Sequence, residues 1–167
     1  MDRLYAPWRS GYVGSADDKG GKDACIFCSM FAQSKDEEHF ILRRFTHTII
    51  MLNKYPYNSG HLMILPKEHL ADLEQLAPPV LHELIELTAS ANAILKKATT
   101  CHALNVGLNL GKAAGGSQAS HLHMHVLPRW TGDTNFLATL ADTKTISLDL
   151  PKMYRELKPH FEALPTR

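Results

Sequence analysis

Apolar residues recur with two different periods along the chain, and the change of period separates predicted strands from predicted helices. Residues 40–45 (FILRRF), 47–53 (HTIIMLN) and 61–66 (HLMILP) are rich in β-branched and other apolar residues, which is typical of strands. The segment KYPYNSG (54–60) contains Pro, Asn, Ser and Gly in close order, as turns do. We therefore expect the three strands to be antiparallel neighbours.

A helical period runs through residues 78–100, where Pro78 and Pro79 mark a helix start and Lys96 and Lys97 suit the dipole at its end. The apolar stripe predicted to face the core consists of Val80, Leu81, Leu84, Leu87, Ala91, Ile94, Leu95 and Ala98.

Shorter elements surround this long helix. Residues 24–34 suggest a short helix or knuckle, and residues 150–165 a final helix. Residues 103–111 alternate as a strand, in which Gly107 suggests a bulge or a close backbone approach. Strands on either side of one long helix predict an α+β fold, with a mainly antiparallel sheet of about five strands packed with the long helix and shorter helices.

Composition narrows the classes of protein to consider. With 167 residues and a formal net charge of +1, the chain is about the size of one domain and has no overall attraction to nucleic acid. No apolar run approaches the length of a membrane span, and the first residues do not resemble a signal peptide. We expect a cytoplasmic protein with no nucleic-acid or membrane partner. Cys25, Cys28 and Cys101 are too few and unevenly spaced for a disulfide framework.

Three histidines stand at alternate positions in the segment ASHLHMHVLPRW (119–130): His121, His123 and His125. In a strand, alternate side chains share one face, so the three imidazoles would lie about 6.6–6.8 Å apart along it. Leu122 and Met124 would point into the core. A lone histidine on a strand is usually structural, but three in register indicate chemistry.

Two kinds of chemistry use such a row. Alternating histidines can hold a transition metal, although Asp133 is the only carboxylate that follows soon after them. Alternatively, one imidazole is a nucleophile toward phosphorus and a neighbour is the acid. The glycine-rich loop at 107–120 (GLNLGKAAGGSQAS) favours the second, because glycines let backbone N–H groups converge on an anion and Asn109 and Ser117 can donate to phosphate oxygens.

The segment HLHMHVL resembles the signature of the histidine triad (HIT) family, in which three histidines alternate with apolar residues. The likeness extends over roughly residues 24–136, and MLNKYPYNSGHLMILPKEHLADL resembles the family's upstream segment. LYAPWRSGYV, NVGLNLG and PRWTGDTNF resemble the bacterial diadenosine tetraphosphate phosphorylase (ATP adenylyltransferase) branch. The resemblance implies a single HIT domain over residues 1–167, with an N-terminal arm at 1–23 and a C-terminal helical extension at 137–167.

The resemblance also implies roles for individual residues. His123 would be the nucleophile on an α-phosphate, with its other ring nitrogen held by a backbone carbonyl, and His125 would be the acid and a phosphate ligand. Asn53 takes the position of the family's ribose ligand. The family often has Gln-Ser or Gln-Thr where this loop has Ser117-Gln118, which leaves the side-chain donor open. The expected phosphate and pocket residues are Asn109, Gly116, Ser117, Gln118 and Trp130, with Ile26, Phe27 and Leu52 as candidates for the base pocket.

Some HIT proteins bind zinc through a cysteine pair, a histidine after the ILPKEH-type strand and the first triad histidine. Here these residues are Cys25, Cys28, His69 and His121, with His47 as a less favoured fourth ligand. On this interpretation His121 is structural. Of the remaining histidines, we expect His61 to have the best chance of touching the site.

The resemblance thus favours nucleotidyl transfer from a dinucleoside polyphosphate, through a covalent nucleotidyl-His123, to phosphate or water. The alternatives are hydrolysis of nucleoside phosphoramidates by the same residues, a non-catalytic nucleotide-binding protein, and a catalytic metal held by the triad. Family members of this type are usually homodimers, and an adenosine nucleotide is the expected substrate. No metal is needed in the transfer step itself.

Overall fold

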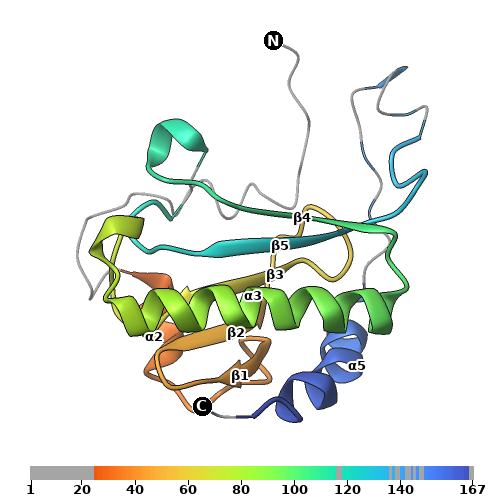
Figure 1. Ribbon diagram of the computed structural model, residues 1–167. Helices are drawn as coiled ribbons and strands as arrows, with labels where there is room; N and C mark the ends of the chain where they lie inside the picture. The colour runs from red at the N-terminus through yellow and green to blue at the C-terminus, as the bar shows by residue number, and fades with distance from the viewer. Residues whose placement is uncertain are drawn as a thin grey trace.

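The centre of the computed structural model is a five-stranded antiparallel sheet, in the spatial order β1-β2-β3-β5-β4. The structure describes residues 25–115, 118–135, 137, 140, 141, 144, 146 and 149–165. Figure 1 shows the sheet with the long helix lying across it. The strands are β1 (Ile41–Arg44), β2 (Thr48–Leu52), β3 (Leu62–Pro66), β4 (Ala103–Leu108) and β5 (Met124–Arg129). The α+β fold and the three neighbouring antiparallel strands predicted from the sequence are confirmed.

The strand period divides the sheet's side chains between two apolar clusters. On β2, Ile50 and Leu52 pack toward the long helix, whereas Ile49 and Met51 pack toward the short N-terminal helix. All five residues of β2 and of β3 are buried, because both strands lie inside the sheet and have helices over both faces. Alternate residues of these strands therefore face the long helix, and the residues between them face the short N-terminal helix.

The long helix, α3 (Pro78–Thr99), covers one face of the sheet (Figure 1). It begins with Pro in its first turn and carries Lys96 and Lys97 in its last, and Thr100 caps its C-terminus in the left-handed conformation. Its buried stripe is narrower than the sequence suggested, because Leu81 is 38% exposed and Ala98 is also exposed. The stripe consists of Val80, Leu84, Leu87, Thr88, Ala91 and Leu95.

The predicted final helix is α5 (Leu150–Glu162), and it packs against β1 and α3. Tyr154, Leu157 and Phe161 enter the main core, and the Tyr154 hydroxyl donates to the carbonyl of Ile41 at 3.2 Å. Lys158 donates to the carbonyl of Leu42 at 2.9 Å. These contacts tie the C-terminal segment to the edge of the sheet opposite β4.

On the other face lies α2 (Ile26–Phe31), which contributes Phe27 to the second apolar cluster. Two 3-10 turns complete the described elements: η3 (Leu73–Gln75) and η4 (Lys112–Ala114). Among the described residues, no helix is long and apolar enough to span a membrane. The arm expected at 1–23 lies outside the described residues, so the single-domain organisation over 1–167 stays a prediction.

Two local expectations from the sequence are wrong. Pairing between β4 and β5 runs without interruption from Ala103 to Leu108, and a Cβ at Gly107 would meet no atom within 4 Å, so Gly107 marks neither a bulge nor a close approach. In addition, β5 begins at Met124, so two of the three alternating histidines precede the strand.

Candidate active site

The three alternating histidines lie on the α2 side of the sheet, although His125 alone belongs to β5. The preceding segment is held in place by the N–H of Leu122, which donates to the carbonyl of Leu70 at 2.7 Å. The ring of Phe27 lies 5.5 Å from that of His121 and 5.6 Å from that of His123. Leu122 packs in the core under α3. The alternation therefore separates imidazoles from core residues as predicted, even outside regular strand pairing.

The ring of His123 is fixed by its own segment. Its Nδ1 lies 2.8 Å from the carbonyl oxygen of His121. A carbonyl can only accept, so Nδ1 carries the proton and Nε2 carries the lone pair. Burial lowers the pKa of His123, which is 6% exposed, so the ring is neutral at neutral pH. The backbone-carbonyl bond predicted from the resemblance is present.

A fourth imidazole, that of His61, lies beside the triad and comes from the end of the loop before β3. Nε2 of His61 lies 2.9 Å from Nδ1 of His125, and the Tyr57 ring packs 4.8 Å from that of His61. Burial, helped by repulsion from His125 and His123, lowers the pKa of His61 to about 3. Burial and His123 lower the pKa of His125 to about 4. Both rings are therefore neutral at neutral pH. His61 is the one of the remaining histidines that the sequence led us to expect at the site, whereas nothing in the pattern singled out Tyr57.

A cavity opens beside His123 and His125. It brings together three expected substrate residues, Asn53, Asn109 and Gln118, while Gly116 and Ser117 lie outside the described residues. Nδ2 of Asn109 lies 3.4 Å from Nε2 of His125. Trp130 is half-buried and is not among the described residues that line this cavity, so the structure does not bring it to the site.

One wall of the cavity is apolar. Leu52, a candidate for this wall, points instead into the core under α3, because the strand period gives the opposite face to its neighbour Met51. The polar part of the lining contains one ionised side chain, Lys54, and no carboxylate among the described residues. The apolar lining residues are Ile26, Phe27, Met30, Met51 and Met63.

The four predicted metal-ligating residues converge beside the triad. The ligand atoms of Cys25, Cys28, His69 and His121 all lie within 4.8 Å of one another. Cys25 and Cys28 come from the start of α2, where the Cys-x-x-Cys spacing puts both thiols within one helical turn. His69 follows β3, and His121 precedes β5. Three segments distant in sequence thus meet at one point, and the group can hold a metal ion.

The distances suit a tetrahedral ion. Nδ1 of His121 lies 3.4 Å from Sγ of Cys25 and 3.6 Å from Sγ of Cys28, and Nδ1 of His69 lies 3.4 Å from Sγ of Cys28. Zinc bonds of about 2.3 Å to sulfur and 2.0–2.1 Å to nitrogen, set at the tetrahedral angle, separate S and N by about 3.5 Å. Nε2 of His121 donates to the carbonyl of Pro66 at 2.9 Å, which leaves Nδ1 as the ligand atom.

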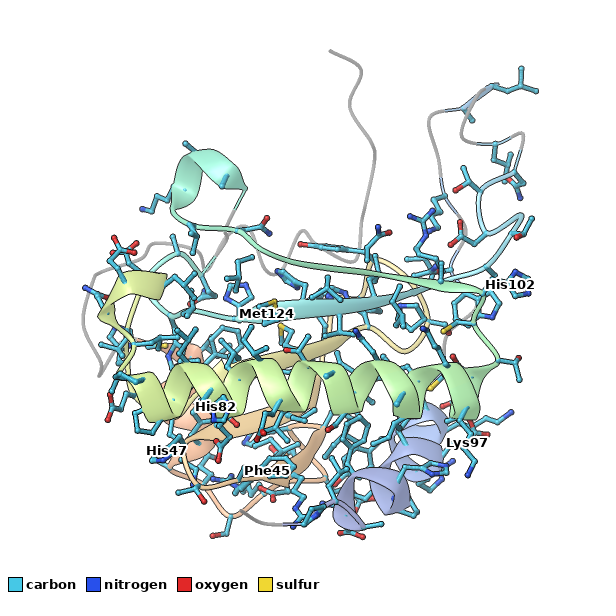
Figure 2. The ribbon with its side chains drawn as sticks, in the orientation of Figure 1. Phe45, His47, His82, Lys97, His102 and Met124 are labelled. Carbon is cyan, nitrogen blue, oxygen red and sulfur yellow. The ribbon has the colours of Figure 1, made fainter. Side chains whose placement is uncertain are left out.

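The structure does not form the two other metal sites considered from the sequence, one with His47 as a ligand and one held by the three triad histidines. His47 lies beside α3, where its backbone N–H donates to Glu83 at 2.8 Å (Figure 2). The three triad rings have separate partners rather than a shared centre: the cysteines for His121, a backbone carbonyl for His123, and His61 for His125.

Asp133, the nearby carboxylate, has a different role. Its side chain is 8% exposed and accepts from Nε of Arg129 at 2.6 Å and from Nδ2 of Asn58 at 2.9 Å. The bonds from Arg129 hold the pKa of Asp133 well below its usual range. Asn58 also donates to the carbonyl of Pro128 at 3.0 Å, so this network fastens the 54–60 loop to the end of β5. The sequence does not reveal this network, because Asn58 lies 75 residues from Asp133 and the pair of Arg129 with Asp133 forms outside any predicted helix.

Comparisons with known proteins agree with this geometry. The model of the HIT domain family matches residues 34–132. An AP-4-A phosphorylase from Mycobacterium tuberculosis is 37% identical over 162 residues, which cover 95% of this chain and 81% of that protein.

Solved structures share the fold. A Zn-bound histidine triad family protein from Mycobacterium smegmatis superposes with a TM-score of 0.69 and 23% identity, over 85% of this chain and 96% of that one. A hypothetical histidine triad nucleotide-binding protein from Sulfolobus tokodaii has a TM-score of 0.66 and 24% identity, over 83% and 92%. The chain therefore belongs to the HIT domain family, where it is an enzyme similar to the AP-4-A phosphorylases.

Proposed function

We propose that this protein transfers a nucleotidyl group from a dinucleoside polyphosphate to inorganic phosphate, with His123 as the nucleophile. The observation that carries the proposal is the bond from Nδ1–H of His123 to the carbonyl of His121, 2.8 Å long. It leaves a neutral imidazole with its lone pair on Nε2, in a ring that lines the cavity. The similarity to an AP-4-A phosphorylase makes diadenosine tetraphosphate the substrate of choice.

In the first step, the lone pair on Nε2 of His123 forms a bond to the α-phosphorus, and the bond from that phosphorus to the bridging oxygen breaks. The electron pair leaves with that oxygen as part of ATP. In the second step, an oxygen of inorganic phosphate attacks the same phosphorus, the P–N bond breaks, and ADP is released. His123 returns to its neutral form with its proton on Nδ1.

His125 is placed to assist the leaving oxygen. It neighbours His123, with ring centroids 4.8 Å apart, and is neutral at neutral pH. An uncharged imidazole N–H can stabilise developing negative charge as a hydrogen-bond donor. Asn109 and Gln118 supply further polar groups on this side of the cavity. Gly116 and Ser117 stay candidates for the phosphate cradle, and Asn53 for the ribose contact.

The base would lie against the apolar wall. Ile26, Phe27 and Met51 offer an apolar surface without a charged group, which suits a nucleotide base. Lys54, an exposed residue of the cavity lining, supplies a positive charge for a polyphosphate chain.

We also propose that Cys25, Cys28, His69 and His121 hold a structural zinc ion. Two thiols and two imidazoles form a donor set typical of closed, four-coordinate zinc sites. The Zn-bound neighbour from M. smegmatis shows that the fold accommodates zinc. The ion would join α2 to the segment before β5 and so fix the carbonyl that orients His123.

We further propose a homodimer in which the β4 edge and the outer face of α3 form the interface. β4 is a sheet edge with four exposed residues of six, and unpaired edges invite pairing. Val106 is 44% exposed on β4, and Leu81 and Ile85 are 38% and 52% exposed on α3. Cytoplasmic location and the absence of a nucleic-acid partner stay predictions.

Phosphate dependence tests the reaction. With diadenosine tetraphosphate, the enzyme should form ADP and ATP in equal amounts only when inorganic phosphate is present, as measured by ion-exchange chromatography. His123→Ala should lower turnover about a thousandfold or more while retaining nucleotide binding. His160→Ala, which alters an exposed histidine on α5, should have no effect. Hydrolysis that does not depend on phosphate would identify the protein as a hydrolase, and a preference for adenosine phosphoramidates would identify it as a phosphoramidate hydrolase. Nucleotide binding without turnover would show that it is not catalytic. Each of these results would contradict the proposal.

Metal content tests the zinc proposal. The purified protein should contain about one zinc per chain by inductively coupled plasma mass spectrometry. Cys25→Ser should abolish the zinc and lower the melting temperature, because the ion links segments that otherwise rely on packing alone. Cys101→Ser, in a buried cysteine outside the group, should retain the zinc. Metal-free wild-type protein with the same melting temperature would contradict the proposal.

Sedimentation tests the dimer. The wild-type protein should sediment at twice 18.7 kDa, and Val106→Glu with Ile85→Glu should sediment at 18.7 kDa. Charges buried in an interface without partners cost several kcal/mol. Leu140→Glu, at a residue that is 77% exposed, adds charge without altering the proposed interface and should leave the dimer intact. A monomeric wild-type protein at micromolar concentration would contradict the proposal.

A further inference from the structure

The protons on the two linked histidines of the site are positioned by backbone N–H groups of the loop that follows β2. The N–H of Tyr55 donates to Oδ1 of Asn53 at 2.9 Å. This bond fixes which way the Asn53 amide faces, because an N–H needs the oxygen and not the nitrogen of the amide. Nδ2 of Asn53 is therefore the atom that lies 3.3 Å from Nδ1 of His61.

A second donor approaches the same ring nitrogen. The N–H of Tyr57 donates to Nδ1 of His61 at 3.1 Å. With two donors directed at it, Nδ1 has to be an acceptor and carries no proton. Because burial keeps this ring neutral, its one proton lies on Nε2.

The tautomer of His61 determines the tautomer of His125 in the triad. Nε2 of His61 lies 2.9 Å from Nδ1 of His125, so the proton on the first makes the second an acceptor. A neutral His125 consequently carries its proton on Nε2, toward Asn109. The amide of Asn109 can present its oxygen to that N–H by rotating about its last bond. The order of donation is Asn53 to His61 to His125.

We propose that Asn53 is a positioning residue, whose amide acts with the N–H of Tyr57 to keep Nδ1 of His61 free of a proton and thereby holds the proton of His125 on Nε2. The inference rests on the proposed function, in which that N–H donates to the leaving oxygen. With the opposite tautomer, a lone pair on Nε2 would face the same oxygen and repel it. A ribose contact by Asn53 would not by itself require this orientation of the amide.

Asn53→Asp is the informative substitution, because it keeps the size and the acceptor for Tyr55 N–H but replaces the donor with a second acceptor. A carboxylate can still bind ribose hydroxyls. The carboxylate attracts a proton on Nδ1 of His61 more strongly than the one remaining donor, the N–H of Tyr57, opposes it. Nδ1 of His61 should therefore take the proton beside the carboxylate in this variant, and His125 should then donate from Nδ1. The matched control is Asn135→Asp. Asn135 is exposed and its Oδ1 accepts from the N–H of Leu137 at 3.0 Å, in a turn that an aspartate preserves.

Histidine ring tautomers can be read directly from long-range ¹H–¹⁵N spectra of the full-length protein, with His61→Gln and His125→Gln used to assign the signals. In the wild type and in Asn135→Asp, the rings of His61 and His125 should both have an unprotonated Nδ1 and a protonated Nε2. In Asn53→Asp, both rings should have a protonated Nδ1. The proposal is overturned if His61 keeps a bare Nδ1 in Asn53→Asp, or if His61 becomes doubly protonated while His125 is unchanged.

Kinetics supply the functional half of the test. Asn53→Asp should lower kcat for diadenosine tetraphosphate by about tenfold or more, the scale on which a lost donor to a developing anion acts. The p-nitrophenyl ester of AMP, whose leaving group needs no donor, should be affected much less. A change confined to KM would assign Asn53 to ribose binding alone and overturn the proposal. If the wild type turns over neither substrate, the proposed function fails, while the tautomers still decide the role of Asn53.

Discussion

The bond between Nδ1 of His123 and the carbonyl of His121 is the constraint on which the site depends, because it decides which nitrogen can attack. An imidazole free to rotate would present either nitrogen, or a proton, to the cavity. The bond joins residues two positions apart, so it requires an extended segment with a fixed carbonyl direction. That segment is held by Leu122, whose side chain is buried under α3 and whose N–H is bonded to Leu70. Packing on one face of the sheet thus controls chemistry on the other.

His121 contributes at two levels. Its carbonyl orients the nucleophile, and its ring belongs to the four-residue group that can hold a metal. The Nε2–H bond to the carbonyl of Pro66 links the same ring to the end of β3. Burial lowers its pKa to about 4, so its Nδ1 is available as a ligand at neutral pH. We infer that a metal at this point stabilises the active-site geometry without taking part in the transfer step.

Much of this arrangement could be predicted because it follows from short-range patterns. The alternation of His121, His123 and His125 predicts a shared face, and the period of residues 78–100 predicts α3. The contacts that could not be predicted depend on how individual loops fold and on distant segments. The ion pair of Asp133 with Arg129 and the approach of Tyr57 to His61 each span four residues outside any helix, and the bond of Asp133 to Asn58 spans 75 residues. The expectation that Leu52 lines the base pocket is wrong by one position, because consecutive strand residues face opposite sides of the sheet and Met51 lines it instead.

The most direct test of the account is the identification of the covalent intermediate. The enzyme would be mixed with diadenosine tetraphosphate in the absence of phosphate, denatured at alkaline pH to preserve a P–N bond, and its peptides examined by mass spectrometry. If His123 is the nucleophile, one adenylyl group should be found on the peptide that contains His121, His123 and His125, attached to His123 and absent after phosphate is added. An adenylyl group on another residue, or steady phosphorolysis with no adduct on His123 when the reaction is stopped during turnover, would contradict this role of His123.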